Sequence, residues 1–199
     1  MKKRIEERWF AWLMRQASRW HEPLIAHRKR TLLADLRGDV LEIGAGAGVN
    51  LKYLNKEVRW TGYEPNRILA AGIPSGQVIA AEFAEPAGPY DAIIATLVLC
   101  SVAEPHRVLR SIADSLRPRG RFIFIEHVGG SPGSPLRRSQ DRWQRVWSCC
   151  AGGCRPNRDT EQSIREAGFE IESIERFDLP MWLAGPHIAG VAVKRLELG

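Results

Sequence analysis

The stretch from Val40 to Gly48 constrains the fold more than any other part of this chain. It is a short apolar run followed by glycine at Gly44, Gly46 and Gly48, and the residues after it keep helical spacing up to Leu54. Glycine lacks a Cβ atom, so it permits positive φ angles and lets a ligand approach the backbone closely. A following helix points unpaired N–H groups at such a turn. The stretch therefore predicts a strand, a tight turn and a helix that can hold a ligand.

The spacing of these glycines narrows the choice of ligand. A dinucleotide fingerprint needs Gly-x-Gly-x-x-Gly, but its third glycine would fall on Val49 counting from Gly44, and on Leu51 counting from Gly46. The pattern is instead acidic-x-Gly-x-Gly-x-Gly, with Glu42 as the acidic residue. This spacing disfavours a nicotinamide-dependent oxidoreductase. A glycine-rich connection that binds nothing stays open as an alternative.

The pattern resembles the first motif of class I S-adenosylmethionine-dependent methyltransferases. In that family the loop lies beneath the methionine and ribose portions of the cofactor, S-adenosyl-L-methionine. The resemblance implies a Rossmann-like α/β fold whose seven-stranded, mostly parallel sheet has an antiparallel last strand and helices on both faces. The loop residues that it implies for cofactor binding are Glu42, Gly44, Ala45, Gly46, Gly48 and Asn50.

The next segment supplies an acidic partner for the loop. Residues 58–64 read as a second strand that ends in Glu64, and Pro65-Asn66 opens a helix. A carboxylate at this point can accept both hydroxyl protons of a ribose, as in the related dinucleotide folds. We therefore expect Glu64 and Pro65 to contact the cofactor.

Two further strands are predicted to border the same ligand. Residues 76–83 read as a third strand, where the family resemblance implies the adenine contact. Residues 90–101 are nearly continuously apolar, as in a central strand covered on both faces, and their end should border the transferred methyl group. The candidates from these strands are Glu82, Phe83, Thr96, Leu97 and Val98.

The rest of the chain continues the alternation of helices and strands. A helix is predicted from Glu104 to Leu116, and residues 129–157, with a helix over 136–147, interrupt the pattern where insertions shape substrate sites. A helix over 158–167 is closed by Gly168. The remaining predicted strands cover residues 121–128, 171–177 and 187–195.

Residues 1–20 predict a basic amphipathic helix rich in tryptophan. Such a helix can pack on its own domain as a lid over the cofactor, which we favour, or lie at a membrane surface. Pro23 is expected to open a second helix that ends near Gly38. The 199 residues suit one methyltransferase domain, with residues 1–38 as its helical lid and 129–157 as its substrate-site insertion.

Charge and cysteine content limit the partners. The formal charge of +6 favours anionic surfaces without indicating a chemistry. The four cysteines are too few for a disulfide framework and predict a reduced, cytoplasmic setting. Cys149-Cys150-x-x-x-Cys154 lacks the paired units of zinc sites, so no metal is expected. No apolar run approaches the roughly 18 residues of a membrane span.

Several blocks resemble one branch of the superfamily, the thiol S-methyltransferases described as methyltransferase-like seven proteins, with their small bacterial relatives. One of these blocks is Glu126 to Val128, and the most particular are Leu97 to Val102 and Pro186 to Gly190. The resemblance implies a small, apolar acceptor, most specifically a thiol. Quinone C-methylation, phospholipid N-methylation and a membrane-associated module with an inactive cofactor site are the alternatives.

The acceptor chemistry suggests which side chains take part. A thiol must become a thiolate, and a histidine is a suitable base or electrostatic partner. His127 and His187 are the candidates, with Glu126 as an orienting group. Cys100 and Cys154 are expected to pack, because methyl transfer needs no covalent intermediate. Nucleic acid is not expected as a partner, because the Asn/Asp-Pro-Pro-aromatic motif of amino-methyltransferases is replaced by residues 96–99, Thr-Leu-Val-Leu. The oligomeric state stays open.

Overall fold

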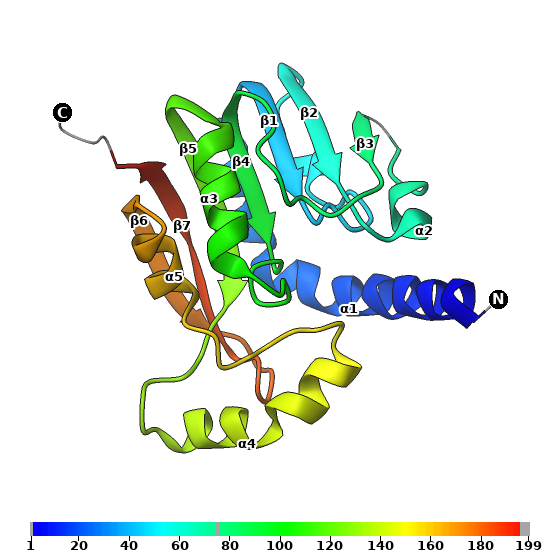
Figure 1. The fold of residues 1–199 in the computed structure, drawn as a ribbon, viewed down its shortest axis with the longest axis vertical. Helices are drawn as coiled ribbons and strands as arrows, with labels where there is room; N and C mark the ends of the chain where they lie inside the picture. The colour runs from blue at the N-terminus through cyan, green and yellow to red at the C-terminus, as the bar shows by residue number, and fades with distance from the viewer. Residues whose placement is uncertain (1, 75, 196–199) are drawn as a thin grey trace. The chain divides into compact units, whose positions relative to one another are not determined.

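The computed structural model describes residues 2–74 and 76–195. Its helices and strands are α1 (Lys2–Leu33), β1 (Gly38–Ile43), η1 (Leu51–Tyr53), β2 (Val58–Tyr63), α2 (Arg67–Ala70), β3 (Gln77–Ile79), β4 (Tyr90–Thr96), α3 (Pro105–Ser115), β5 (Leu116–His127), α4 (Pro135–Cys150), α5 (Thr160–Glu166), β6 (Phe169–Asp178) and β7 (Pro186–Lys194). The strand order is β3-β2-β1-β4-β5-β7-β6 (Figure 1). Strands β1, β2 and β3 pair in parallel, whereas β7 is antiparallel to β5 and β6. The predicted seven-stranded sheet with an antiparallel last strand is confirmed.

Within these residues the chain forms two compact units. The first contains the residues up to 83 together with 90–94, and the second contains 84–89 together with the residues from 95 onward. Strand β4 therefore contributes its first five residues to one unit and its last two to the other.

The first unit is built on β1, β2 and β3. The last four residues of β1, from Val40 to Ile43, are all buried, as expected for a strand covered on both faces. The α1 helix packs against η1 and α2. Lys29 of α1 is 1% exposed and its Nζ lies 2.5 Å from the carboxylate of Glu22. The Tyr53 hydroxyl of η1 donates to the same carboxylate at 2.7 Å, so this hydrogen bond joins η1 to an ion pair within α1.

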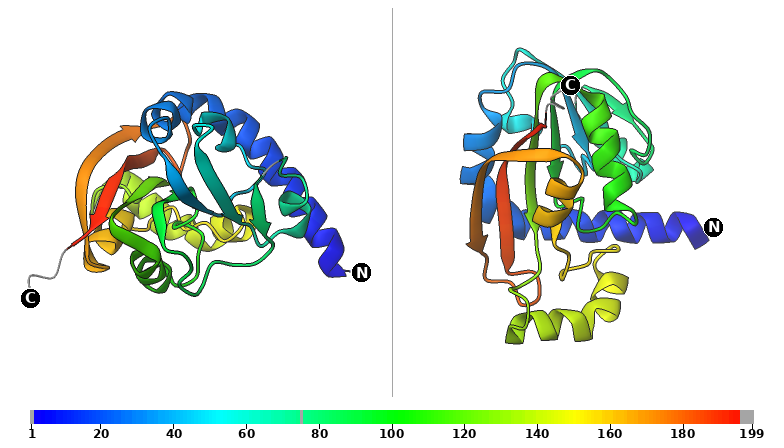
Figure 2. Two further views of the ribbon diagram at one scale, coloured as in Figure 1. Left: turned by 90° about the horizontal axis from the view of Figure 1, so that it is seen from above. Right: turned by 60° about the vertical axis from the view of Figure 1, so that its left-hand side comes forward.

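The α1 helix is continuous, which corrects the prediction of two helices separated before Pro23. Proline removes one N–H and crowds the carbonyl four residues earlier, so it bends a helix that packing holds together. Figure 2 shows α1 changing direction along its length. Within the described range, no helix combines the length and apolar character needed to cross a bilayer. Trp9, Trp12 and Trp20 are exposed, and membrane-surface contact by α1 stays a prediction, as does its role as a lid.

Three predicted elements are shorter than the sequence indicated. The helix after the glycine turn is only the 3₁₀ turn η1, because the chain must return to start β2 at Val58 a few residues later. Strand β3 ends at Ile79, before Glu82 and Phe83. Strand β4 ends at Thr96, so the apolar residues after it belong to a loop. An apolar run alone does not mark where strand pairing stops.

The second unit is built on β5, β7 and β6. Phe122 and Phe124 of β5 and Phe169 of β6 are fully buried and form one aromatic cluster, with centroids 5.4 Å apart for Phe122 and Phe169. The helix predicted over 158–167 is α5, and Gly168 after it has a φ of +87°, as expected for a residue that closes a helix. The strands predicted over 171–177 and 187–195 are β6 and β7.

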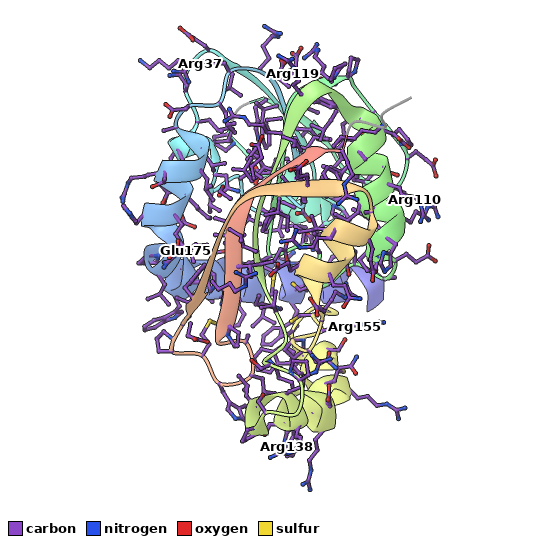
Figure 3. All side chains as sticks on the ribbon, turned by 90° about the vertical axis from the view of Figure 1, so that its left-hand side faces the viewer. Arg37, Arg110, Arg119, Arg138, Arg155 and Glu175 are labelled. Carbon is purple, nitrogen blue, oxygen red and sulfur yellow. The ribbon has the colours of Figure 1, made fainter. Side chains whose placement is uncertain are left out.

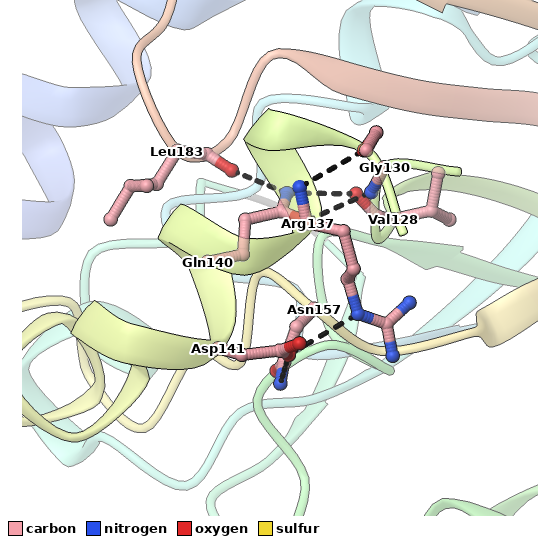
Figure 4. Close-up of polar contacts among 8 residues, drawn as sticks. Val128, Gly130, Arg137, Gln140, Asp141, Asn157 and Leu183 are labelled. Carbon is pink, nitrogen blue, oxygen red and sulfur yellow. Dashed lines mark hydrogen bonds and ion pairs between the residues drawn. The ribbon is translucent and has the colours of Figure 1, made fainter. Parts of the chain in front are cut away.

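Helix α4 confirms the helix predicted within residues 129–157. Its single buried side chain is Gln140, whose Nε2 donates to the Leu183 carbonyl at 2.8 Å and whose Oε1 accepts the Gly130 N–H at 2.8 Å (Figure 4). A second set of contacts links Asp141 to Arg137 and Asn157. Most of α4 is exposed or half-buried.

The positive charge is spread over several elements. Figure 3 labels Arg110 on α3 and Arg138 on α4, and both side chains are exposed. Arg37, Arg119 and Arg155 are exposed as well. The positive charge is therefore not confined to the basic helix α1.

Candidate active site

The glycine turn has the backbone conformation that its sequence predicted. Gly44, Gly46 and Gly48 have φ angles of +63°, +57° and +72°, a region that residues with a Cβ rarely adopt. The Ala45 N–H donates to the Tyr63 carbonyl at 3.0 Å, which fixes the turn to the end of β2. A Cβ on Gly46 would meet nothing nearer than the Gly44 carbonyl oxygen at 4.0 Å. The space beside Gly46 is therefore open to a ligand.

Glu64 lies at the end of β2 and binds the turn directly. It is 5% exposed, and its two carboxylate oxygens accept the N–H groups of Gly46 and Asn66, each at 2.8 Å. Burial raises the pKa of this carboxyl group, and the two backbone N–H groups oppose the rise. Each oxygen has a second lone pair, which is what two ribose hydroxyls require.

Asn66 was not among the predicted cofactor residues, yet its side chain forms hydrogen bonds with both α2 and α1. Its side-chain oxygen accepts the N–H groups of Ile68 and Leu69, capping α2. Its Nδ2 donates to the Glu7 carbonyl of α1 at 3.0 Å. Pro65 beside it is exposed. A groove of about 570 Å³ lies between α1 and α2, lined by Arg8, Trp12 and Arg67 among others.

Glu42 and Asn50, on either side of the glycine turn in sequence, are buried and form a hydrogen bond with each other. Glu42 is 2% exposed; its Oε1 accepts from Asn50 Nδ2 at 2.9 Å and its Oε2 accepts from Trp60 Nε1 at 2.9 Å. These buried hydrogen bonds stabilise the glycine turn, because they tie the strand before it to the residues after it. Burial raises the pKa of Glu42 to about 7, although the Trp60 hydrogen bond and the nearby Lys29 charge oppose the rise.

The raised pKa of Glu42 predicts a pH dependence of stability. Between its ordinary value of 4.5 and about 7, the folded chain keeps the proton on Glu42 while the unfolded chain has lost it. The free energy of unfolding should therefore fall as pH rises through this window, by about 3 kcal/mol at about 1.4 kcal/mol per pH unit. Urea unfolding at pH 5 and pH 8 should show this fall in the wild type, and a smaller one in Glu42→Gln.

Glu57→Gln is the matched control, because Glu57 is exposed beside Arg37. It should keep the wild-type pH dependence. An equal fall in the wild type and in Glu42→Gln would contradict the assignment of this pH dependence to Glu42.

The two candidates from the third predicted strand differ in position. Glu82 is exposed. Phe83 is 5% exposed, and its ring meets that of Tyr63 edge to face with centroids 5.3 Å apart. An aromatic pair of this kind holds Phe83 in a fixed orientation. The adenine contact of these two residues stays a prediction.

Thr96, Leu97 and Val98 belong to the second unit, where β4 gives way to a loop. Leu97 has a φ of +58°, which is uncommon for a residue with a side chain and costs about 1–2 kcal/mol. Its N–H donates to the Ile125 carbonyl at 2.8 Å. Backbone strain of this kind persists only where surrounding contacts hold it.

Glu126 of β5 supplies those contacts. It is fully buried, and its carboxylate accepts the N–H groups of Val98 at 2.8 Å, Leu99 at 3.0 Å and Cys100 at 3.3 Å. Burial raises its pKa, and these N–H groups oppose the rise. The predicted role of Glu126 was to orient a histidine. The hydrogen bonds of its carboxylate go to the loop after β4, and its role in orienting a histidine stays a prediction.

Arg158 also holds this loop, although it was not among the predicted site residues. Its Nη1 donates to the carbonyls of Leu99 and Val102, the latter at 2.9 Å. The position of Arg158 in the chain gives no sign of this, because the two segments are far apart in sequence.

His127 and His187 lie opposite each other on β5 and β7. Both are buried, and their rings meet edge to face with centroids 5.8 Å apart. The Nδ1 of His187 lies 2.7 Å from the Gly185 carbonyl oxygen. Because a carbonyl only accepts, this Nδ1 carries the proton. Phe177 stacks on the His187 ring with centroids 5.3 Å apart.

His127 has a different partner. Its Nε2 lies 3.1 Å from the Sγ of Cys154, and its Nδ1 is buried without a hydrogen-bond partner among the described residues. Burial lowers the pKa of His127, but the contact with Cys154 and the charge of Glu126 outweigh it, so the pKa is raised. The pKa of Cys154 is also raised, by its contact with Cys100 and by burial. Sequence spacing gave no sign that Cys100, His127 and Cys154 come together.

Comparison with known proteins identifies the family. The family described as a methyltransferase domain matches residues 4–174. Thiol S-methyltransferase TMT1B of Homo sapiens is 31% identical over 191 residues, which cover 84% of this chain and 78% of the relative. The chain is a class I S-adenosylmethionine-dependent methyltransferase. A second relative of this methyltransferase, thiol S-methyltransferase TMT1A of Homo sapiens, is 29% identical over 214 residues, covering 96% of this chain and 88% of the relative.

A solved structure shows the same fold. The 1,6-didemethyltoxoflavin-N1-methyltransferase of Burkholderia thailandensis, described with bound S-adenosylhomocysteine, has a TM-score of 0.66 and 20% identity over 92% of this chain and 84% of that one. The cofactor of this methyltransferase is S-adenosyl-L-methionine. Its own residues fit that group, because Gly46 borders open space and Glu64 presents lone pairs beside it.

Proposed function

We propose that this methyltransferase transfers its methyl group to the sulfur of a small, apolar thiol. The observation that carries the proposal is the likeness to two human proteins named as thiol S-methyltransferases, at 29% and 31% identity over most of the chain. The buried histidine pair of β5 and β7 supports it, because a thiol must be ionised before it can attack.

The residues divide into those that bind the cofactor and those that serve the acceptor. When bound, the cofactor supplies a methyl group already activated on a sulfonium, so the protein has to orient and desolvate the reactants. Glu64 holds the ribose hydroxyls, and the backbone beside Gly46 lets the cofactor approach. The bordering of the transferred methyl group by Thr96, Leu97 and Val98 stays a prediction from the family resemblance.

We propose that His187 is the base that accepts the proton of the thiol. Its Nδ1 donates to the Gly185 carbonyl, so its lone pair lies on Nε2, the tautomer that a base needs. Phe177 stacked on the ring keeps this orientation. His127, whose Nε2 lies 3.1 Å from the Sγ of Cys154, is the second candidate.

Replacing His187 with asparagine should lower kcat/KM for a thiol by roughly 100- to 1,000-fold near pH 7, because general-base catalysis contributes on this scale. The deficit should shrink as pH rises past about 8.5, where free thiols ionise on their own. The measurement is the pH profile of kcat/KM. His106→Asn on α3 is the control, because this histidine is half-exposed and its replacement should leave the profile unchanged.

A deficit in His187→Asn that is constant across pH would contradict the base assignment. If only His127→Asn shows the pH-dependent deficit, the base is His127.

The acceptor class is tested with matched panels of alkyl and aryl thiols, quinols and phospholipids. Formation of S-adenosylhomocysteine measures turnover, and mass spectrometry of the product identifies the methylated atom. We expect methyl thioethers. Methylation of a quinol carbon or a phospholipid nitrogen, with no thiol accepted, would overturn the proposal.

A further inference from the structure

Three buried side chains that can bind a metal meet in the second unit. Cys100 lies in the loop after β4, His127 ends β5 and Cys154 follows α4. The two sulfur atoms and an imidazole nitrogen all lie within 4.8 Å of one another. The three residues are 1%, 8% and 5% exposed. Two cysteines and a histidine are the ligand types that zinc prefers.

The distances between the three ligand atoms are compatible with the binding of one shared metal ion. Zinc binds cysteine sulfur at about 2.3 Å and histidine nitrogen at about 2.0–2.1 Å in tetrahedral geometry, which places ligand atoms roughly 3.5–3.8 Å apart. The Nε2 of His127 lies 3.1 Å from the Sγ of Cys154, and no pair exceeds 4.8 Å. Side-chain shifts of a few tenths of an ångström up to about 1 Å would bring all three atoms to zinc distances.

The main chain holds the three ligands in place. The Cys100 N–H donates to Glu126, and the Cys100 carbonyl accepts from the Arg155 N–H at 2.9 Å. The Gly129 N–H donates to the Arg158 carbonyl at 2.9 Å. The segments that carry Cys100, His127 and Cys154 are thus linked to one another close to each ligand. Such a frame positions the side chains before any ion binds.

The surroundings of Cys154 suit a metal-bound thiolate. The indole N–H of Trp147 donates to its Sγ at 3.0 Å, and an indole nitrogen can only donate. An acceptor role suits a thiolate sulfur better than a thiol, which accepts weakly. Two thiolates and a divalent cation sum to zero charge, so the loaded site avoids the cost of an unpaired buried charge.

We propose that Cys100, His127 and Cys154 bind one zinc ion, with the fourth position taken by a ligand other than the histidine, cysteine and acidic side chains of residues 2–74 and 76–195. A borderline-soft ion without redox chemistry is the best match to two thiolates and an imidazole. The expectation that the chain binds no metal rested on the spacing of Cys149, Cys150 and Cys154. The first two are exposed, and the partners of Cys154 come from other segments. The site goes beyond the proposed function and leaves His187 as the base.

The test uses the full-length chain, fully reduced, loaded with zinc and desalted. Elemental analysis should give one zinc per chain. Replacing zinc with cobalt should give intense thiolate-to-cobalt charge-transfer absorption and the visible bands of a tetrahedral ion. Cys100→Ser and Cys154→Ser should lose both the stoichiometric zinc and these bands. Cys149→Ser and Cys150→Ser are the matched controls and should keep both.

Trp147→Phe tests the surroundings of the site. It preserves an aromatic ring and removes the N–H that bonds Cys154, so zinc affinity in a chelator competition should fall roughly 10- to 100-fold, the usual effect of an outer-shell partner. Affinity unchanged in Trp147→Phe would count against Cys154 as a ligand.

The proposal does not depend on the variants folding, because the cobalt spectrum and the zinc content are read on the wild-type chain. Reduced wild-type protein that retains no zinc and shows no thiolate charge-transfer absorption with cobalt overturns it. A Cys100–Cys154 disulfide that persists under reductant in zinc-loaded protein, seen as a mass lower by two hydrogens, also overturns it. Neither readout requires methyl transfer, so failure of the thiol proposal would be seen separately.

Discussion

Glu64→Ala should weaken binding of S-adenosyl-L-methionine by on the order of 100-fold or more, as measured by calorimetric titration. A charge-assisted hydrogen bond contributes about 1.5–3 kcal/mol, and the alanine variant loses two of them to the ribose. The same carboxylate also fixes the N–H groups of Gly46 and Asn66, so its loss loosens the turn as well. The two effects act in the same direction.

Two further variants serve as comparisons for Glu64→Ala. Glu64→Gln keeps the length of the side chain and one acceptor oxygen, so its loss of affinity should be smaller than that of alanine. Glu57→Ala removes an exposed carboxylate just before β2 and should bind like the wild type. Wild-type affinity in Glu64→Ala would rule out the ribose role of Glu64.

Glu126→Gln should lower the free energy of unfolding by about 3 kcal/mol or more. The carboxylate accepts three backbone N–H groups in a fully buried position. A glutamine offers one acceptor oxygen and turns an NH₂ group toward the remaining N–H donors, which leaves buried donors unsatisfied at about 1–3 kcal/mol each. The left-handed backbone of Leu97 would also lose its support. Urea unfolding at constant pH measures the change.

Glu172→Gln on β6 is the control for this experiment, because its side chain is exposed. Its stability should stay within about 0.5 kcal/mol of the wild type, as for ordinary surface substitutions. A Glu126→Gln protein as stable as this control would show that the three hydrogen bonds contribute little.

The sequence predicted the parts of the fold that depend on local chemistry. The turn needs glycine at Gly44, Gly46 and Gly48, and their positive φ angles follow from that requirement. Glu64 was found because a strand end lies at a predictable place beside the turn. The helices and strands after residue 100 followed from their periodicity, and the structure confirms them with shifts of a few residues at the ends.

The features that the sequence did not predict depend on contacts between segments that are far apart in the chain. Pro23 lies inside a helix that packing keeps continuous, which local preference alone does not indicate. The role of Glu126 follows from three N–H groups 26 to 28 residues earlier in the chain. The meeting of Cys100 with His127 and Cys154 depends on the loop after β4, the end of β5 and the segment after α4 coming together, and no spacing in one segment can reveal it.

The attachment of α4 affects how this enzyme can diverge. One buried side chain, Gln140, fixes a helix whose other residues are exposed or half-buried. Surface substitutions change stability little, so selection can alter most of α4 without unfolding the second unit. Related enzymes that keep this glutamine can therefore differ freely along the helix. The prediction that residues 129–157 shape the substrate site makes α4 the segment to randomise in a library that tests for altered acceptor preference.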